Sequence, residues 1–294
     1  MLTPRLSIRL ALLALFAFGV LSAAEPAWRP LFNGKDLTGW DTYLGKPNAA
    51  SNVPGLKRDQ KGAYLEPIGV NRDPFNNFSV VSIDGRPAIH LSGEGFGMMT
   101  TQENFENYRL RLQFKWGQKK WPPREQAARD SGLLYHVHGE PGRSSGVWPA
   151  CVELQIQEHD CGDLYAIITQ LTVPAREEVG PKNQTLYHYD PAGQPTDFKQ
   201  EKPIGNRCIR LEDAEKPTGE WNTIELICVG GDSLHIVNGK VVMRLKNARQ
   251  QDAAGAWVPL SSGHICLQTE GAEVFYRDVE VQPITAVPAE FGEK

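Results

Sequence analysis

The segment Cys151–Asp160, with the sequence CVELQIQEHD, carries the residues best suited to chemistry. Apolar and polar residues alternate along it, which predicts a β-strand with two different faces. The apolar face consists of Val152, Leu154 and Ile156, and the polar face of Glu153, Gln155 and Gln157. Amides both donate and accept hydrogen bonds, so this face suits a hydroxyl-rich ligand. The alternative is the solvated outer face of an ordinary sheet.

A second candidate group lies in the strand predicted for residues 133–138, which ends in His136, Val137 and His138. A His-x-His pair places two imidazoles side by side, as in many metal sites. If a divalent cation is bound, His136, His138 and Glu153 would be its ligands. The sequence leaves open whether the protein has such a cofactor. The alternatives are a hydrogen-bonded surface pair, or a catalytic or substrate-contacting role for His136.

Cationic side chains follow the strand predicted from Tyr108 to Trp116, where apolar and polar residues again alternate. If its polar face is continuous with that of Glu153, Lys115 or Arg111 is a candidate to hold a ligand oxygen. The alternative is a solvated face.

Further candidates for contacts with a sugar stand at the ends of predicted strands. Trp148 and Trp121 offer aromatic faces for stacking on a sugar ring, or plug the end of the core. Asp130 precedes the strand that carries His136, and Glu270 stands in the last turn. Both carboxylates are candidates to bind hydroxyl groups.

The N-terminal 24 residues have the pattern of a secretory signal peptide. Arg5 and Arg9 precede the apolar run 10–21, and small residues end at Ala24. No further long apolar stretch follows, so we expect an exported protein, periplasmic or secreted, without a transmembrane anchor. Residues 25–294 are expected to form a single domain. Removal of the signal peptide, which contains Arg5 and Arg9, would change the formal net charge from −4 to −6. This negative charge argues against nucleic acid as a partner.

Five cysteines follow the predicted signal peptide, so at least one is unpaired within a monomer. Cys228 and Cys266 lie in apolar, strand-like segments and are expected to be buried thiols. A bridge between Cys151 and Cys161 is left open, and no cysteine spacing resembles a zinc site.

The chain as a whole predicts an all-β protein. About a dozen alternating segments are separated by turn dipeptides such as Asp84-Gly85 and Asn238-Gly239. Tight turns favour antiparallel pairing, and the result expected is a jelly-roll β-sandwich of two antiparallel sheets, one of them concave. The region 174–217 is expected to be a long polar loop.

With these motifs in place, the chain resembles the family of 3-keto-disaccharide hydrolase domains. The resemblance covers nearly all of the predicted mature chain and implies a concanavalin A-like fold. The motifs that carry it, in chain order, are LFNGKDLTGW, ENYRLRLQFKW, RDSGLLYHVHG, VELQIQE, GEWNTIEL, HIVNGKVV and HICLQTEGAEVFYRDVEV.

The resemblance implies cleavage of glycosides whose sugar is oxidised to a ketone at C3. The ketone acidifies the C2 proton, so the aglycone leaves by elimination and water adds afterwards. On this basis Glu153 is the expected base, His136 the acid, and Lys115 or a cation the stabiliser of the enolate. Gln155, Gln157 and Asp130 would orient hydroxyls. Family members often carry an arginine where this chain has His136–His138, which leaves the identity of the acid open.

Two alternatives remain at this stage. Laminarinase-type retaining hydrolases of similar fold carry E-x-D-x-x-E, whereas this chain reads E-x-Q-x-x-E from Glu153 to Glu158. Without a bulge, the second carboxylate points to the opposite face of the strand. A non-catalytic, lectin-like carbohydrate-binding domain is the other alternative.

Overall fold

The computed structural model describes residues 26–292, so the predicted signal peptide lies outside the described residues. Their regular structure is β-strand apart from two short 3-10 helices, η1 (Pro181–Asn183) and η2 (Ala289–Phe291). In the part of the chain that is described, no helix has the length and apolarity needed to cross a membrane.

The strands form two sheets. The smaller, nine-stranded sheet, called the small sheet below, has the order β15-β11-β10-β9-β20-β6-β2-β3, and β7 pairs with β20. Its strands are β2 (Trp40–Leu44), β3 (Gly69–Val70), β6 (Gly97–Thr101), β7 (Phe105–Glu106), β9 (Asp130–His138), β10 (Ala150–Gln157), β11 (Leu164–Ile167), β15 (Arg207–Cys208) and β20 (Ser262–Thr269).

The twelve-stranded sheet, called the large sheet, has the order β13-β12-β18-β17-β16-β8-β21-β5-β4, with β1, β14 and β19 paired to β21, β12 and β18. Its strands are β1 (Arg29–Pro30), β4 (Phe78–Ile83), β5 (Arg86–Leu91), β8 (Tyr108–Lys120), β12 (Gln170–Val179), β13 (Thr185–Tyr189), β14 (Gln194–Phe198), β16 (Asn222–Val229), β17 (Asp232–Val237), β18 (Lys240–Gln251), β19 (Trp257–Pro259) and β21 (Ala272–Pro283).

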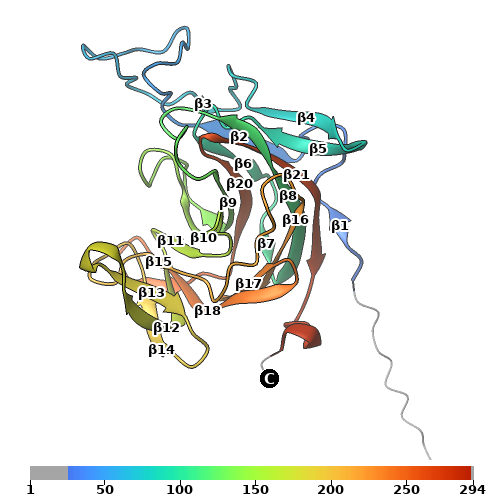
Figure 1. The fold of residues 1–294 in the computed structure, drawn as a ribbon, viewed down its shortest axis with the longest axis vertical. Helices are drawn as coiled ribbons and strands as arrows, with labels where there is room; N and C mark the ends of the chain where they lie inside the picture. The colour runs from blue at the N-terminus through green and yellow to red at the C-terminus, as the bar shows by residue number, and fades with distance from the viewer. Residues whose placement is uncertain (1–25, 293–294) are drawn as a thin grey trace, which may run out of the picture.

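The two sheets pack face to face because alternate residues of their strands are apolar (Figure 1). Phe114 and Trp116 of β8 share one buried cluster with Leu133 of β9 and Leu154 of β10. All the pairs of named strands are antiparallel. The predicted fold class, an all-β, concanavalin A-like jelly-roll sandwich of two antiparallel sheets, is confirmed.

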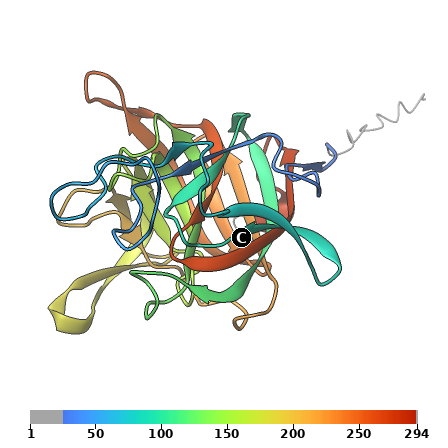
Figure 2. The ribbon, with the colours of Figure 1, turned by 90° about the horizontal axis from the view of Figure 1, so that it is seen from above.

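The region 174–217 differs from the expectation of a long loop. Its residues build the second half of β12 and all of β13, β14 and β15, and the first three of these strands extend the large sheet at one end. Phe198 is fully buried there, although prolines obscure the pattern. The tip of the β12–β13 hairpin projects from the body of the molecule (Figure 2). The chain changes from the small to the large sheet between β11 and β12, where Ile168 has a φ of 54°.

All five cysteines are buried free thiols. The bridge left open between Cys151 and Cys161 is absent. Cys161 belongs to the core between the sheets, whereas Cys151 packs with Leu134 and Cys266 in a separate cluster. The two side chains therefore lie on opposite sides of the small sheet.

Candidate functional site

The predicted polar face of β10 lies on the outer face of the small sheet, the face turned away from the large sheet. Val152, Leu154 and Ile156 pack into the core between the sheets, so Glu153 and Gln155 point outward. Both are nonetheless largely removed from solvent, with exposures of 4% and 6%. A charged group is seldom buried without a specific reason, so this part of the outer face is unlike an ordinary solvated surface.

Gly132 of β9 makes room for the Glu153 side chain. A Cβ atom on Gly132 would lie 2.4 Å from Oε1 of Glu153 and 2.8 Å from Oε1 of Gln268, which belongs to the neighbouring strand β20. The absence of a side chain on β9 therefore brings a carboxylate and an amide from the two flanking strands over the same backbone position.

A second group continues the site towards the start of β9. Asp130 lies opposite Gln157 in the β9–β10 pairing, and its Oδ2 accepts a 2.5 Å hydrogen bond from Nε2 of Gln157. The same oxygen lies 2.5 Å from Nη2 of Arg124, and Nη1 of that arginine lies 3.6 Å from Oε1 of Glu270. One guanidinium thus joins two carboxylates from different strand ends.

The three carboxyl groups influence one another's pKa values, and Arg124 pairs with two of them, Asp130 and Glu270. Burial, followed by the charges of Asp130 and Glu270, raises the pKa of Glu153 well above its usual value. Burial and the charge of Asp130 raise the pKa of Glu270 to about 8, against the opposing effect of Arg124. Burial raises the pKa of Asp130 to about 6, although Arg124 and Gln157 oppose it. Asp130 and Glu270 can therefore exchange protons near neutral pH, as general acids and bases must.

Several buried polar atoms of this group make no hydrogen bond among the described residues. They are Oε1 of Gln155, Oε1 of Gln268, Oδ1 of Asp130 and Nε of Arg124. Buried polar atoms in folded proteins nearly always have a partner. These three acceptors and one donor match in kind the hydroxyl and carbonyl groups of a sugar.

The outer face is apolar next to this polar group. Leu134, Val137 and Cys266 form a cluster with Trp148 and Tyr165 packed against it. Tyr165 lies opposite Glu153 in the β10–β11 pairing. Trp148 is therefore on the same face of the sheet as Glu153, as expected for a stacking residue, but it is also half-buried against apolar side chains.

The expectation that His136 joins Glu153 is wrong, because β9 contains a bulge there. Leu134 pairs with Cys266 and Val137 with His264, so β9 has one residue more than β20 between these two pairs. His136 lies in this bulge and has a φ of 50°. Leu134 and Val137 both face outward. His136 therefore lies with Tyr135 on the inner side, with ring centroids 5.2 Å apart. Burial lowers the pKa of His136 to about 4, so the ring is neutral at neutral pH.

The expected placement of Lys115 and Arg111 is also wrong, because β8 belongs to the large sheet. Their side chains alternate with core residues and point away from the small sheet. Lys115 lies 3.2 Å from Asp84, and Arg111 lies 2.7 Å from Glu280. The alternative of a solvated outer face holds for both.

The described residues also provide no metal centre of the expected kind. Within residues 26–292, no group of three or more His, Cys, Asp or Glu side chains is arranged to hold a metal ion. Nδ1 of His138 lies 3.0 Å from the carbonyl oxygen of His136, and the bulge separates both rings from the face of Glu153.

The alternative of a laminarinase-type carboxylate pair is not supported by the position of Glu158. This residue follows the end of β10 and forms a 2.7 Å ion pair with Arg129. Its Oε1 also accepts a hydrogen bond from Thr218. Asp130 and Glu270 are instead the carboxyls whose charges raise the pKa of Glu153.

Sequence reasoning missed Arg124 and Gln268. Arg124 lies in the proline-rich loop after β8, where no periodicity indicates which way a side chain points. Gln268 continues the alternation of β20, in which the core residues Ile265 and Leu267 leave Cys266 and Gln268 on the outer face. That alternation is a signal that could have identified Gln268.

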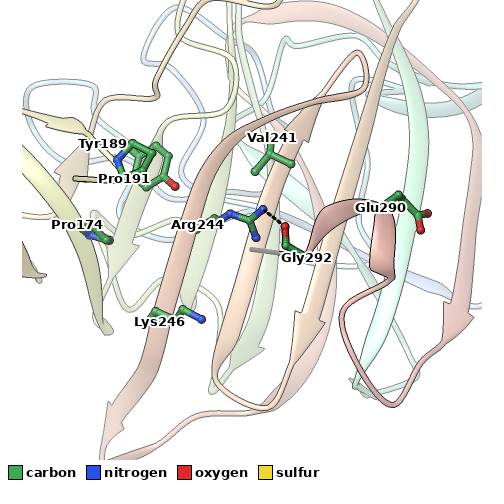
Figure 3. A pocket seen from close by; sticks show the side chains of 8 residues that line it. All are labelled: Pro174, Tyr189, Pro191, Val241, Arg244, Lys246, Glu290 and Gly292. Atoms are coloured by element: carbon green, nitrogen blue, oxygen red, sulfur yellow. Dashed lines mark hydrogen bonds between the residues drawn. The ribbon is translucent and has the colours of Figure 1, made fainter. Parts of the chain in front are cut away.

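A separate cavity lies elsewhere, between β12, β18 and the C-terminal segment. It has a volume of about 530 Å³ and is lined by Tyr189, Arg244, Lys246 and Glu290 among others (Figure 3). Arg244 donates a hydrogen bond to the Gly292 carbonyl there, and Glu290 is paired with Arg109 at 3.0 Å. Among the described residues that line it, the one carboxylate is thus neutralised, so the group around Glu153 is chemically the better candidate.

Comparisons with solved structures give distant matches. A candidate glycosyl hydrolase from Parabacteroides distasonis is 19% identical, with 87% of this chain and 94% of that chain covered and a TM-score of 0.45. A second one from the same organism is 17% identical, with 88% and 100% covered and a TM-score of 0.44. LamAcat from Zobellia galactanivorans is 12% identical, with 83% and 90% covered and a TM-score of 0.37.

No curated protein matches the chain. The family comparison covers most of the sequence, since residues 27–282 match the model of the 3-keto-alpha-glucoside-1,2-lyase-like domain. This range includes both sheets and all the polar residues gathered around Glu153. The protein belongs to the 3-keto-alpha-glucoside-1,2-lyase-like family.

Proposed function

We propose that the protein is an exported enzyme, periplasmic or secreted, that cleaves 3-keto-glucosides by elimination. The observation that carries the proposal is the convergence of three carboxyls with raised pKa values and one arginine on a single sheet face. The family description, which names a 1,2-lyase acting on a 3-keto-alpha-glucoside, supports the choice of substrate and of the bond that breaks.

In the proposed reaction, the ionised form of Glu153 removes the proton from C2 of the sugar, and the raised pKa makes this form a stronger base than an ordinary carboxylate. The C–H electron pair is delocalised onto the C3 oxygen and then forms the C1–C2 double bond as the bond from C1 to the aglycone oxygen breaks. The aglycone takes up a proton and leaves as an alcohol. Water can then add across the double bond, with hydroxyl at C1 and hydrogen at C2, to give the 3-keto sugar.

The neighbours of Glu153 fit the remaining roles. Arg124, whose guanidinium pairs with Asp130, is the candidate to stabilise negative charge on the C3 oxygen. Glu270, whose pKa is about 8, holds a proton at neutral pH and is the candidate to donate it to the aglycone. The amide oxygens of Gln155 and Gln268 can accept hydrogen bonds from sugar hydroxyls.

The test compares an aryl 3-keto-α-glucoside with its unoxidised parent, using release of the phenol as the readout. We expect only the keto substrate to be cleaved, with a primary isotope effect when C2 carries deuterium. Glu153→Gln should lower kcat by roughly 10²–10⁴-fold, because the amide cannot accept the proton.

Glu158→Gln is the matched control. It should retain most activity, since Glu158 is held by Arg129 outside the group around Glu153. Cleavage of the parent glucoside alone, with equal losses in both variants, would instead indicate a retaining hydrolase. Binding of the keto sugar without turnover in the unaltered protein would indicate a carbohydrate-binding domain.

A further inference from the structure

Glu273 of β21 binds the end of the neighbouring strand β8, at an irregularity in the pairing of the two strands. Its Oε2 accepts hydrogen bonds from the backbone amides of Gln118 and Lys119, at 2.9 and 3.3 Å. Its Oε1 lies 3.1 Å from Nε2 of His90, whose Nδ1 is 3.2 Å from Oγ of Ser79. Burial raises the pKa of Glu273, but the two amides and His90 outweigh it, so the carboxylate stays charged at neutral pH.

The backbone is adapted to this contact at Gly117. A Cβ atom there would lie 2.2 Å from Oε2 and 2.4 Å from Cγ of Glu273. Only a glycine lets the carboxylate reach the two amides that follow. The Glu273 side chain is 13% exposed, so these hydrogen bonds are shielded from competing water.

The β20–β21 hairpin, to which Glu273 belongs, also contacts the loop that follows β8, at Gly271. The amide of Trp121 donates a 2.8 Å hydrogen bond to the carbonyl of Gly271. The side chain of Arg124 packs over Gly271, where a Cβ atom would lie 3.0 Å from Cβ and Cδ of the arginine. From this position the guanidinium reaches Asp130 and Glu270.

We propose that Glu273 is a positioning residue that fixes segment 117–124 and thereby sets the position of the Arg124 guanidinium in the site. Glu273 does not itself touch the reacting atoms. This inference rests on the proposed function, in which Arg124 stabilises charge that develops during the reaction. It assigns to the β20–β21 hairpin two tasks: Gln268 and Glu270 enter the site, and Gly271 and Glu273 hold the loop that completes it.

The test is Glu273→Ala, with Glu273→Gln as the conservative variant. We expect Glu273→Ala to lower kcat roughly 10–100-fold with little change in KM, because a misplaced Arg124 weakens stabilisation of the transition state and not substrate binding. Glu273→Gln keeps an acceptor oxygen for the amides and should recover part of the loss. Glu280→Ala, which removes an exposed ion pair from the same strand, is the matched control and should leave kcat unchanged.

A double-mutant cycle separates positioning from a general loss of stability. In an Arg124→Ala background, Glu273→Ala should lower kcat no further, because its effect passes through Arg124. Equal losses in both backgrounds would overturn the inference.

Hydrogen exchange without substrate tests the anchoring independently of turnover. The amides of Gln118, Lys119 and Trp121 should exchange faster in Glu273→Ala and at the unaltered rate in Glu280→Ala. Unchanged exchange in Glu273→Ala would overturn the inference, even in an enzyme that cleaves the keto substrate. An unaltered protein without turnover but with faster exchange in Glu273→Ala would overturn the proposed function and support the anchoring.

Discussion

Gly132 is the residue on which the position of Glu153 depends. Its φ is ordinary, so alanine strains no backbone, but the added methyl group would take the space of Oε1 of Glu153. That oxygen ends a flexible side chain, so the protein should fold while the carboxylate moves. We expect Gly132→Ala to reduce kcat by roughly 100-fold, a typical result of a displacement of about 1 Å in an active site.

Gly180→Ala is the matched control for this substitution. Its Cβ would lie 2.6 Å from a methyl group of Leu186 in the projecting β12–β13 hairpin, far from the site along the chain and in another sheet. Steady-state kinetics and thermal unfolding of both variants provide the check. Full activity in a folded Gly132→Ala variant would mean that Glu153 is not the base.

Glu270 should make the stability of the protein depend on pH. Its pKa is raised from 4.5 to about 8 in the folded state, so the folded protein keeps a proton that the unfolded chain loses at lower pH. The associated stabilisation is complete below about pH 4.5 and is lost as the pH rises to about 8. The free energy of unfolding should therefore fall by a few kcal/mol across this window.

The measurement is denaturant unfolding at several pH values for the unaltered protein and for Glu270→Gln. The variant carries no titratable group at this position, so the difference between the two proteins should grow steadily from pH 4.5 to 8. A constant difference would show that Glu270 has an ordinary pKa.

Individual side chains were predictable from the sequence where a regular strand fixes their direction. Alternation along β10 placed Glu153, Gln155 and Gln157 on one face, and Asp130 followed from its place at the start of the next strand. Arg124 was not predictable, since a loop with two consecutive prolines has no period. Its role depends on contacts with Gly271 and Asp130, which are distant from each other in the sequence.

At the scale of elements, alternation predicts the existence of a strand better than the sheet it joins. The strands β8, β9 and β10 were all expected, yet the sequence did not indicate that β8 lies in the large sheet, which removes Lys115 and Arg111 from the site. Likewise a single bulge reverses the side of His136. Both errors arise because sheet membership and bulges depend on pairing between distant segments.

At the scale of the whole molecule, the outer face of the large sheet carries an apolar patch that the C-terminal segment covers. Ile227, Leu234 and Ile236 are buried there under Ile284, Val287 and Phe291. The segment is fastened by Arg244, which donates a 2.8 Å hydrogen bond to the carbonyl of Phe291, and by the ion pair of Arg109 with Glu290. Figure 1 shows this segment leaving the end of β21 and running through the short helix η2 to the C label.

A chain that ends at Pro283 should therefore lose stability and expose this patch. Three half-buried apolar side chains contribute roughly 3 kcal/mol in total, which predicts a clear decrease in the melting temperature. The shortened protein should also bind a hydrophobic dye, because the three buried residues of β16 and β17 form a contiguous apolar surface. Activity on the keto substrate at low temperature should persist, since the site lies on the other sheet.

Val179→Ser, at a side chain already 76% exposed, is the control and should change neither the melting temperature nor dye binding. An unchanged melting temperature in the shortened chain would mean that the C-terminal segment does not stabilise the large sheet. Loss of activity in a shortened chain that is still folded would mean that the segment contributes to the site.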